Sequence, residues 1–257
     1  MKQKKSPFNN LFLSLITVFL MGLIFVGPIE AGMMDSEKED IGKEITTLYR
    51  ASRGVIAKNQ ALINDASKGN KGLTADVVIS ATKANYKKAT GKNFTPEDAS
   101  SLKGQAQSAL LDAITEVVNN AQPLINEKGK GLKGFLPAIF AKQMGDAFNK
   151  RMVNKSSIKL TAPKNYVRNR ANRPDKWENH VIENIFKKPN YEKNKVYVEQ
   201  ASHKGKPAFR LLLPEYYKQA CLNCHGGPKG AKDITGGKKE GGKLGELGGA
   251  ISFVIYD

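Results

Sequence analysis

The sequence predicts an α+β fold, with helices in the first part of the chain and an antiparallel sheet in the last part. Apolar residues recur at three- and four-residue steps over much of residues 36–152, which is the spacing of amphipathic helices. Short β-prone runs then occur from residue 196 to the C-terminus. Ten of the 24 glycines lie between Gly226 and Gly249, as expected for a loop between such strands.

The first predicted helix begins at Ser36 and runs for about 25 residues. Acidic residues are concentrated at its start, where they interact favourably with the helix dipole. Its stripe would suit a coiled-coil dimer seam, but it lasts only about three heptads and includes two polar residues, so we expect packing on its own domain. The stripe consists of Ile41, Ile45, Leu48, Ser52, Val55, Asn59 and Leu62.

Two more helices are predicted by their end signals. Thr74 is placed to cap a helix that continues to about Ala89 and is closed by Gly91. The tetrapeptide Thr95–Asp98 supplies a cap residue, a first-turn proline and an acidic third position. A third helix is therefore expected from there to near Pro123.

A fourth helix and three strands complete the prediction. The helix follows a linker rich in glycine and lysine and carries apolar residues on one face. A polar stretch between the first two strands is expected to be a hairpin turn. The helix is residues 135–152, with Phe140, Met144 and Phe148 on its face; the strands are residues 196–200, 209–213 and 251–256, and the turn is residues 203–207.

The first 31 residues have the form of a secretory signal. Three lysines precede an apolar run from Leu11 to Val26, and Ala31 stands where a signal peptidase would cut. The run has 16 residues, against about 20 for a membrane span, which favours cleavage over an N-terminal membrane anchor. No cysteine lies near the cut, which excludes a lipoprotein anchor. Residues 32–257 are therefore expected in the periplasm or otherwise outside the cytoplasm, with 32–130 mainly helical and 131–257 carrying a helix, the sheet and the site.

The chain is strongly basic, with a formal charge of +17. Residues 32–257 alone hold 38 basic and 23 acidic residues, so the exported body is basic by itself. Export excludes nucleic acid as a partner. The charge then means either a solvated lysine-rich surface or attraction to anionic lipid at a membrane surface or to an acidic protein.

Both cysteines fall in one pentapeptide, Cys221-Leu-Asn-Cys224-His225, which is the attachment pattern of c-type haem. Two intervening residues let one turn of backbone present both sulfurs to the two vinyl groups of a porphyrin, while the adjacent imidazole ligates the iron. The alternatives are a thiol redox pair, a plain disulfide, or a zinc site that would need a fourth ligand from His180 or His203. Bacterial haem c is attached outside the cytoplasm, so the export signal favours one covalent haem c with His225 as proximal iron ligand.

Several blocks in order resemble a known family. They are Ile158–Pro163, Arg168–Glu178, Pro214–Tyr217, Cys221–Gly226 and Gly248–Ser252. The resemblance is to the single-haem, c-type, PAS-like haem-binding domains, formerly a domain of unknown function, which occur alone or as the sensors of histidine kinases and chemoreceptors. It covers most of residues 36–257. It implies a PAS-like antiparallel sheet flanked by helices, haem on Cys221, Cys224 and His225, and a redox or gas sensory role.

The distal iron ligand stays open. Some members of that family place a cysteine in the helix before an Ala-Pro step, and the corresponding segment here, residues 117–123, has none. The sixth position is taken by His180, Met144, Met152 or His203, or by no residue. For Met144 the alternative is core packing, for His180 a surface or core position, and for His203 exposure in the hairpin turn.

Three arginines, Arg168, Arg170 and Arg173, are candidates for contacts with the haem propionates. Guanidinium forks pair well with carboxylates, and such pairing would orient the ring. The alternative is a solvated basic loop.

Three functions fit a haem protein of this kind. We expect a sensory module for redox state or for CO, NO or O2, acting through a separate redox or signalling protein, since the chain ends at Asp257 directly after its last strand. A small periplasmic electron-transfer cytochrome is the alternative. An enzyme is not expected, because the sequence offers no constellation of acid, base and nucleophile besides the haem site.

Overall fold

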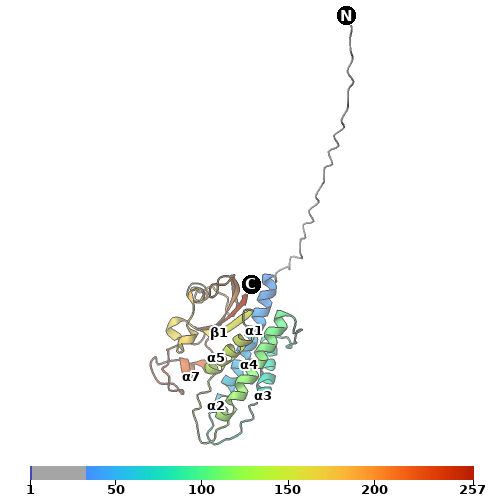
Figure 1. Cartoon of the computed structure of the whole chain (residues 1–257). Coiled ribbons are helices and arrows are strands. Elements are labelled where there is room, and N and C mark those ends of the chain that lie inside the picture. Colours follow the sequence, from blue (N-terminus) through green and yellow to red (C-terminus); the bar gives the residue numbers. More distant parts are fainter. Residues whose placement is uncertain (2–32) are drawn as a thin grey trace. The chain divides into compact units, whose positions relative to one another are not determined.

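The structure, a computed structural model, describes Met1 and residues 33–257. Except for Met1, the predicted signal segment lies outside the described residues. The described part contains seven α-helices and one four-stranded antiparallel sheet, which confirms the predicted α+β, PAS-like arrangement of a sheet flanked by helices (Figure 1). Over this same part, none of the helices has both the length and the apolar character of a bilayer span.

The long N-terminal helix is α1, Asp35–Lys58, and it packs on its own domain as expected. It contacts α3, α5, β3 and β4. Ser52 is buried in the stripe, where its single hydroxyl proton has two acceptors within reach, the Tyr49 carbonyl at 2.9 Å and Met144 Sδ at 3.3 Å. The polar interruption of the stripe is therefore satisfied inside the domain. A short helix, α2, Gln60–Ile63, follows.

The second predicted helix is α3, Ala75–Thr90, and both of its end signals act as expected. Thr74 Oγ1 accepts a hydrogen bond from the Val77 amide at 3.4 Å. Gly91 ends the helix with φ 73°, a left-handed conformation that glycine adopts without steric cost.

The third helix, α4, Leu102–Ile125, ends near Pro123 as predicted but begins later than expected. Its cap is Ser101, whose hydroxyl accepts from the Gly104 amide at 2.9 Å. Thr95–Asp98 stays irregular because Gln107 binds it: the Gln107 amide donates to the Thr95 carbonyl and accepts from the Glu97 amide. Pro123 lies inside the last turn, where it has no N–H to donate to a helical hydrogen bond. The fourth helix is α5, Pro137–Arg151.

The sheet has the order β1-β4-β3-β2, and all neighbours are antiparallel. The three predicted strands are present, with β3 and β4 longer than expected, and β1 is an edge strand that the sequence reasoning missed. Its pairing with β4, from Ser156↔Ile255 to Thr161↔Ala250, is a long-range contact that no local pattern announces. The strands are β1, Ser156–Thr161; β2, Tyr197–Gln200; β3, Ala208–Tyr216; and β4, Leu247–Tyr256.

Different helices pack against the two faces of the sheet. Leu211 and Phe253 lie in the large core shared with α1, α4 and α5. Leu212 and Ala250 lie in a smaller core with α6, Lys176–Val181, and the π-helical turn Ile182–Phe186. Because β3 and β4 are antiparallel neighbours in the middle of the sheet, the chain between them, residues 217–246, leaves and returns at the same end. This connection carries the cysteine-histidine pentapeptide.

Candidate functional site

The pentapeptide forms a helical turn just after β3. The 3₁₀ turn Gln219–Cys221 continues directly into α7, Leu222–His225. Residues three apart lie on one side of such a turn, so Cys221 and Cys224 share a side. Both are free thiols and partly exposed. Burial and the nearby Asp233 raise the pKa of the Cys224 thiol, which disfavours the thiolate that a thiol redox pair would need.

His225 is held by a carboxylate and by an aromatic ring. Its Nδ1 lies 2.9 Å from Glu240 Oε2, and its ring stacks on Tyr217 with centroids 5.4 Å apart and planes at 18°. An ionised carboxylate can only accept a hydrogen bond, so Nδ1 carries the proton. The Nε2 lone pair is then the one available to a metal, which is the arrangement expected of a histidine iron ligand.

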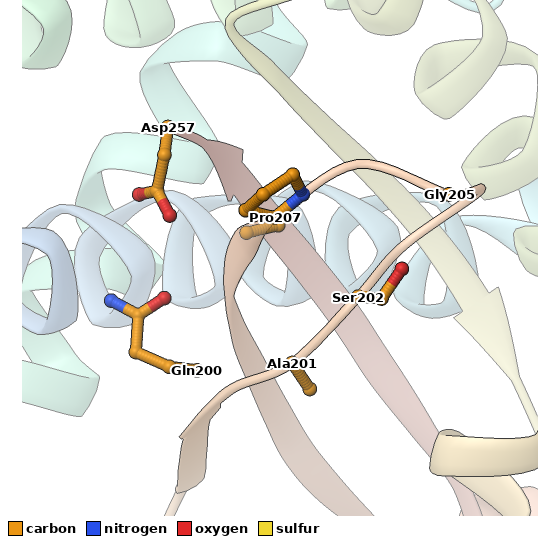
Figure 2. Close-up of a pocket in the computed structure, with 7 residues that line it drawn as sticks. Gln200, Ala201, Ser202, Gly205, Pro207 and Asp257 are labelled. Atoms are coloured by element: carbon orange, nitrogen blue, oxygen red, sulfur yellow. The ribbon is translucent and has the colours of Figure 1, made fainter.

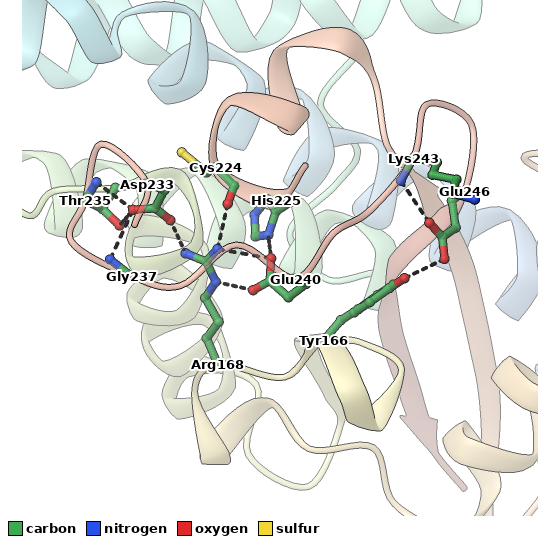
Figure 3. Close-up of polar contacts among 10 residues, drawn as sticks. All are labelled: Tyr166, Arg168, Cys224, His225, Asp233, Thr235, Gly237, Glu240, Lys243 and Glu246. Atoms are coloured by element: carbon green, nitrogen blue, oxygen red, sulfur yellow. Dashed lines mark hydrogen bonds and ion pairs between the residues drawn. The ribbon is translucent and has the colours of Figure 1, made fainter. Parts of the chain in front are cut away.

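Arg168 binds the loop that returns from the pentapeptide to β4 (Figure 3). Its guanidinium donates to Asp233 Oδ2 at 2.6 Å, to both carboxylate oxygens of Glu240, and to the Cys224 carbonyl at 2.7 Å. Asp233 also accepts from the Thr235 amide at 2.7 Å and from the Gly237 amide at 3.1 Å. Arg168 thereby ties the helical turn and the loop together.

Both carboxylates are ionised at neutral pH. Burial alone raises the pKa of Asp233, but hydrogen bonds from Thr235 and Arg168 outweigh it and bring that pKa down to about 2. Burial likewise opposes ionisation of Glu240, and hydrogen bonds from Arg168 and His225 hold its pKa below the usual range. The local cluster therefore combines one guanidinium with two carboxylates.

The glycine-rich loop folds back over the pentapeptide and around Tyr217. Backbone hydrogen bonds join Gly242 to the His225 carbonyl at 2.7 Å and Gly241 to the Gly226 carbonyl at 3.1 Å. A Cβ on Gly242 or Gly248 would overlap the Tyr217 ring. The absence of side chains at these two positions therefore lets the loop close on the ring that supports His225.

The three arginines are separated by the fold. Arg168 reaches the pentapeptide, but four of its five N–H groups are already engaged by the protein. Arg170 lies in the 3₁₀ turn Arg170–Asn172, Arg173 follows it, and both are exposed. In the described part of the chain, neither forms an ion pair with another side chain.

The four candidates for the distal position make their contacts elsewhere. Met144 and Met152 are buried in the large core. His180 is exposed on α6, with Nδ1 3.0 Å from Asn184 Nδ2. His203 lies in the expected turn but is buried, contrary to the expected exposure, because its ring stacks on Tyr256 and Nδ1 lies 2.8 Å from that hydroxyl. Among the residues that the structure covers, no group of three His, Cys, Asp or Glu is placed to hold a metal ion.

His203 makes stability depend on pH. Burial, Arg210 and Lys204 lower its pKa to about 4, from about 6.5 in an unfolded chain. Between these values the unfolded chain binds more protons, so this contribution to stability is complete above pH 6.5 and is lost as the pH falls to 4. We expect His203→Gln to reduce the fall of the unfolding midpoint between pH 6.5 and 4. Thermal unfolding at several pH values, with exposed His180→Gln as the control, measures it; equal profiles for wild type and His203→Gln would contradict it.

An open hollow beside the β2–β3 turn is separate from this site (Figure 2). It lies between the turn and the C-terminal residue Asp257, and it is lined by Gln200, Ala201, Ser202, Gly205, Pro207, Ala208 and Asp257. None of these residues belongs to the connection between β3 and β4.

The sequence reasoning missed Glu240, Asp233 and Tyr217 as parts of the site. One signal was available: Asp233, Glu240 and Glu246 are the only carboxylates in residues 218–246, a segment with six lysines. All three are bound inside the site, since Glu246 accepts from the Tyr166 hydroxyl and from the Lys243 amide.

Comparison with known proteins gives one result for this chain. A family model with the description Tll0287-like matches residues 36–255. No curated protein and no solved structure gives a significant match.

Proposed function

The chain belongs to the Tll0287-like family, a family of PAS-like haem-binding domains, and from this premise we propose that it is an exported protein carrying one covalent haem c. Cys221 and Cys224 form the thioether bonds, and His225 is the proximal iron ligand. The observation that carries the proposal is the donor set: two free thiols on one helical turn, followed by an imidazole whose Nδ1 is engaged and whose Nε2 is available. Export is inferred from the signal-like residues 1–31.

The residues around the pentapeptide suit this role. Tyr217 stacks on His225 and limits rotation of the imidazole, and the glycine-rich loop is hydrogen-bonded to the carbonyls of His225 and Gly226. Arg168 is engaged by protein carboxylates, so the exposed Arg170 and Arg173 are the arginines left to pair with propionates. When bound, the haem supplies a one-electron couple and an iron site for a diatomic ligand.

We propose that the protein is a redox or diatomic-gas sensor that passes its signal to a separate protein, rather than an enzyme. The PAS-like fold supports this role. The role is also supported by residues 117–123 of α4, because this segment contains no cysteine where some relatives place a cysteine ligand. Val117, Val118 and Ala121 are buried there, in the large core. A sixth position without a thiolate leaves the iron open to CO, NO or O2.

Ferrous protein is expected to bind CO, with a shift of the Soret band, and ferric protein to show a high-spin electron paramagnetic resonance signal. Both follow from an open or weakly held sixth position. Spectra of the four single variants of Met144, Met152, His180 and His203 to alanine identify any distal residue. Low-spin iron in both states, unchanged by CO, would contradict the sensor proposal.

One observation favours the alternative, a periplasmic electron carrier. Residues 218–246 contain six lysines, and five of them, Lys218, Lys229, Lys232, Lys238 and Lys243, are exposed. The three carboxylates of the segment are bound internally, so the surface beside the pentapeptide is positive. Such a surface attracts acidic proteins and speeds their encounter. It would equally attract an anionic membrane surface.

A further inference from the structure

We propose that Glu240 tunes the haem iron through His225, and that Arg168 holds Glu240 in place for this purpose. The inference rests on the proposed haem attachment and assigns two positioning residues to that site. Figure 3 shows the chain of contacts, from Arg168 to Glu240 and from Glu240 to the His225 ring.

Glu240 is well placed to act on the imidazole. Its side chain is only 8% exposed, so water competes little for its oxygens. Oε2 accepts from His225 Nδ1 at 2.9 Å, which fixes the tautomer with the proton on Nδ1. Tyr217 stacks on the ring and restrains its plane. The nitrogen that faces the metal is thus selected by the protein before any metal binds.

Arg168 determines the position of Glu240. It donates to both carboxylate oxygens, a bidentate pairing that leaves the carboxylate little rotational freedom. Asp233, whose side chain is fully buried, and the Cys224 carbonyl hold two of the three other guanidinium N–H groups. Because Arg168 also binds the turn that bears Cys224, the cysteines and the glutamate keep a fixed relation.

The contact has a defined chemical consequence. A carboxylate that accepts the second N–H of a ligating imidazole raises the basicity of the nitrogen on the metal. A more basic ligand stabilises ferric iron over ferrous iron. Two carboxylates and one guanidinium leave the cluster with one net negative charge, which acts in the same direction. Glu240 therefore lowers the reduction potential of the iron.

Glu240→Gln tests this in the haem-loaded protein, because glutamine keeps the shape and removes the charge. We expect a higher midpoint potential and a lower Fe–His stretching frequency in the resonance Raman spectrum of the ferrous form. Glu240→Asp keeps the charge and should restore part of both shifts. Asp233→Asn is the matched control, since it touches Arg168 but not His225, and its shifts should be smaller. Equal values for Glu240→Gln, Asp233→Asn and wild type would overturn the proposal.

The haem-free protein supplies a second readout. Nitrogen-15 NMR of the His225 imidazole should show the proton on Nδ1 in wild type, and a redistribution toward Nε2 in Glu240→Gln. The same tautomer in both proteins would overturn the proposed role of Glu240 while leaving haem attachment untouched. Wild-type protein that gains no haem in a host with the maturation machinery would instead overturn the proposed function, and with it the effect on the iron.

Discussion

Replacing Cys221 and Cys224 together with alanine is expected to abolish covalent haem attachment completely. The chain contains no other cysteine, so no sulfur remains to form a thioether bond. Wild-type protein exported from a host with the maturation machinery should be one haem heavier than its polypeptide and should stay red after acid-acetone extraction. The double variant should have the mass of the polypeptide alone and lose its colour. Mass spectrometry and absorption spectra measure both properties.

A control separates attachment from folding and from ligation. His225→Ala leaves both thiols in place, so it should retain haem while the spin state of the iron changes. Because both cysteine side chains are partly exposed, the double variant should also keep the far-ultraviolet circular dichroism of wild type. Unmodified, colourless wild-type protein from the competent host would contradict the proposed function.

Gly248→Ala is expected to lower the free energy of unfolding by about 2–3 kcal/mol, within the range for side chains forced into a packed region. A Cβ there would lie 2.6 Å or less from three atoms of the Tyr217 ring. Tyr217 is buried, and Gly242 closes on the opposite edge of its ring, so it has little room to move aside. For a domain of this size the unfolding midpoint should fall by roughly 5–10 °C. Thermal and urea unfolding measure the loss.

Gly69→Ala is the matched control for this variant. A Cβ at Gly69 meets no heavy atom within 4 Å, and its backbone is not left-handed. The control should therefore remain close to wild type in stability. Tyr217→Ala combined with Gly248→Ala should destabilise less than the sum of the two single changes, because the small residue removes the clash. A Gly248→Ala protein as stable as Gly69→Ala would show that Tyr217 is not confined between the two glycines.

The helices were predictable where their determinants are local. Thr74 and Gly91 mark the ends of α3 because a cap hydroxyl and a left-handed glycine act within one turn of the helix. The stripe of α1 likewise has the helical period itself. The predicted start of α4 was wrong because a contact with a residue farther along the chain decides it. Thr95 has the local signal, but Gln107, more than two turns away, binds its carbonyl and leaves Ser101 as the cap.

The sheet depended more on contacts between distant residues. The strongly apolar β3 and β4 were predictable from their own composition. The edge strand β1 was not, because its place comes from pairing with β4 about 90 positions later in the chain. His203 was expected to be exposed because it lies in a turn, and it is buried because the neighbouring end of β4 brings Tyr256 against it.

The site likewise has a part that local sequence predicts and a part that only the fold brings together. Cys221, Cys224 and His225 lie within five residues of one another, so the proposed haem attachment could be predicted from their spacing, and a single helical turn presents them together. Glu240, Asp233 and Arg168 meet them only because the loop returns to β4 beside the point where it left β3, and because Arg168 comes from a segment 56 residues before Cys224. Residues that form bonds with a cofactor must keep a fixed covalent spacing. Those that orient a ligand need only the right position in space, and that position is set by how the strands pair.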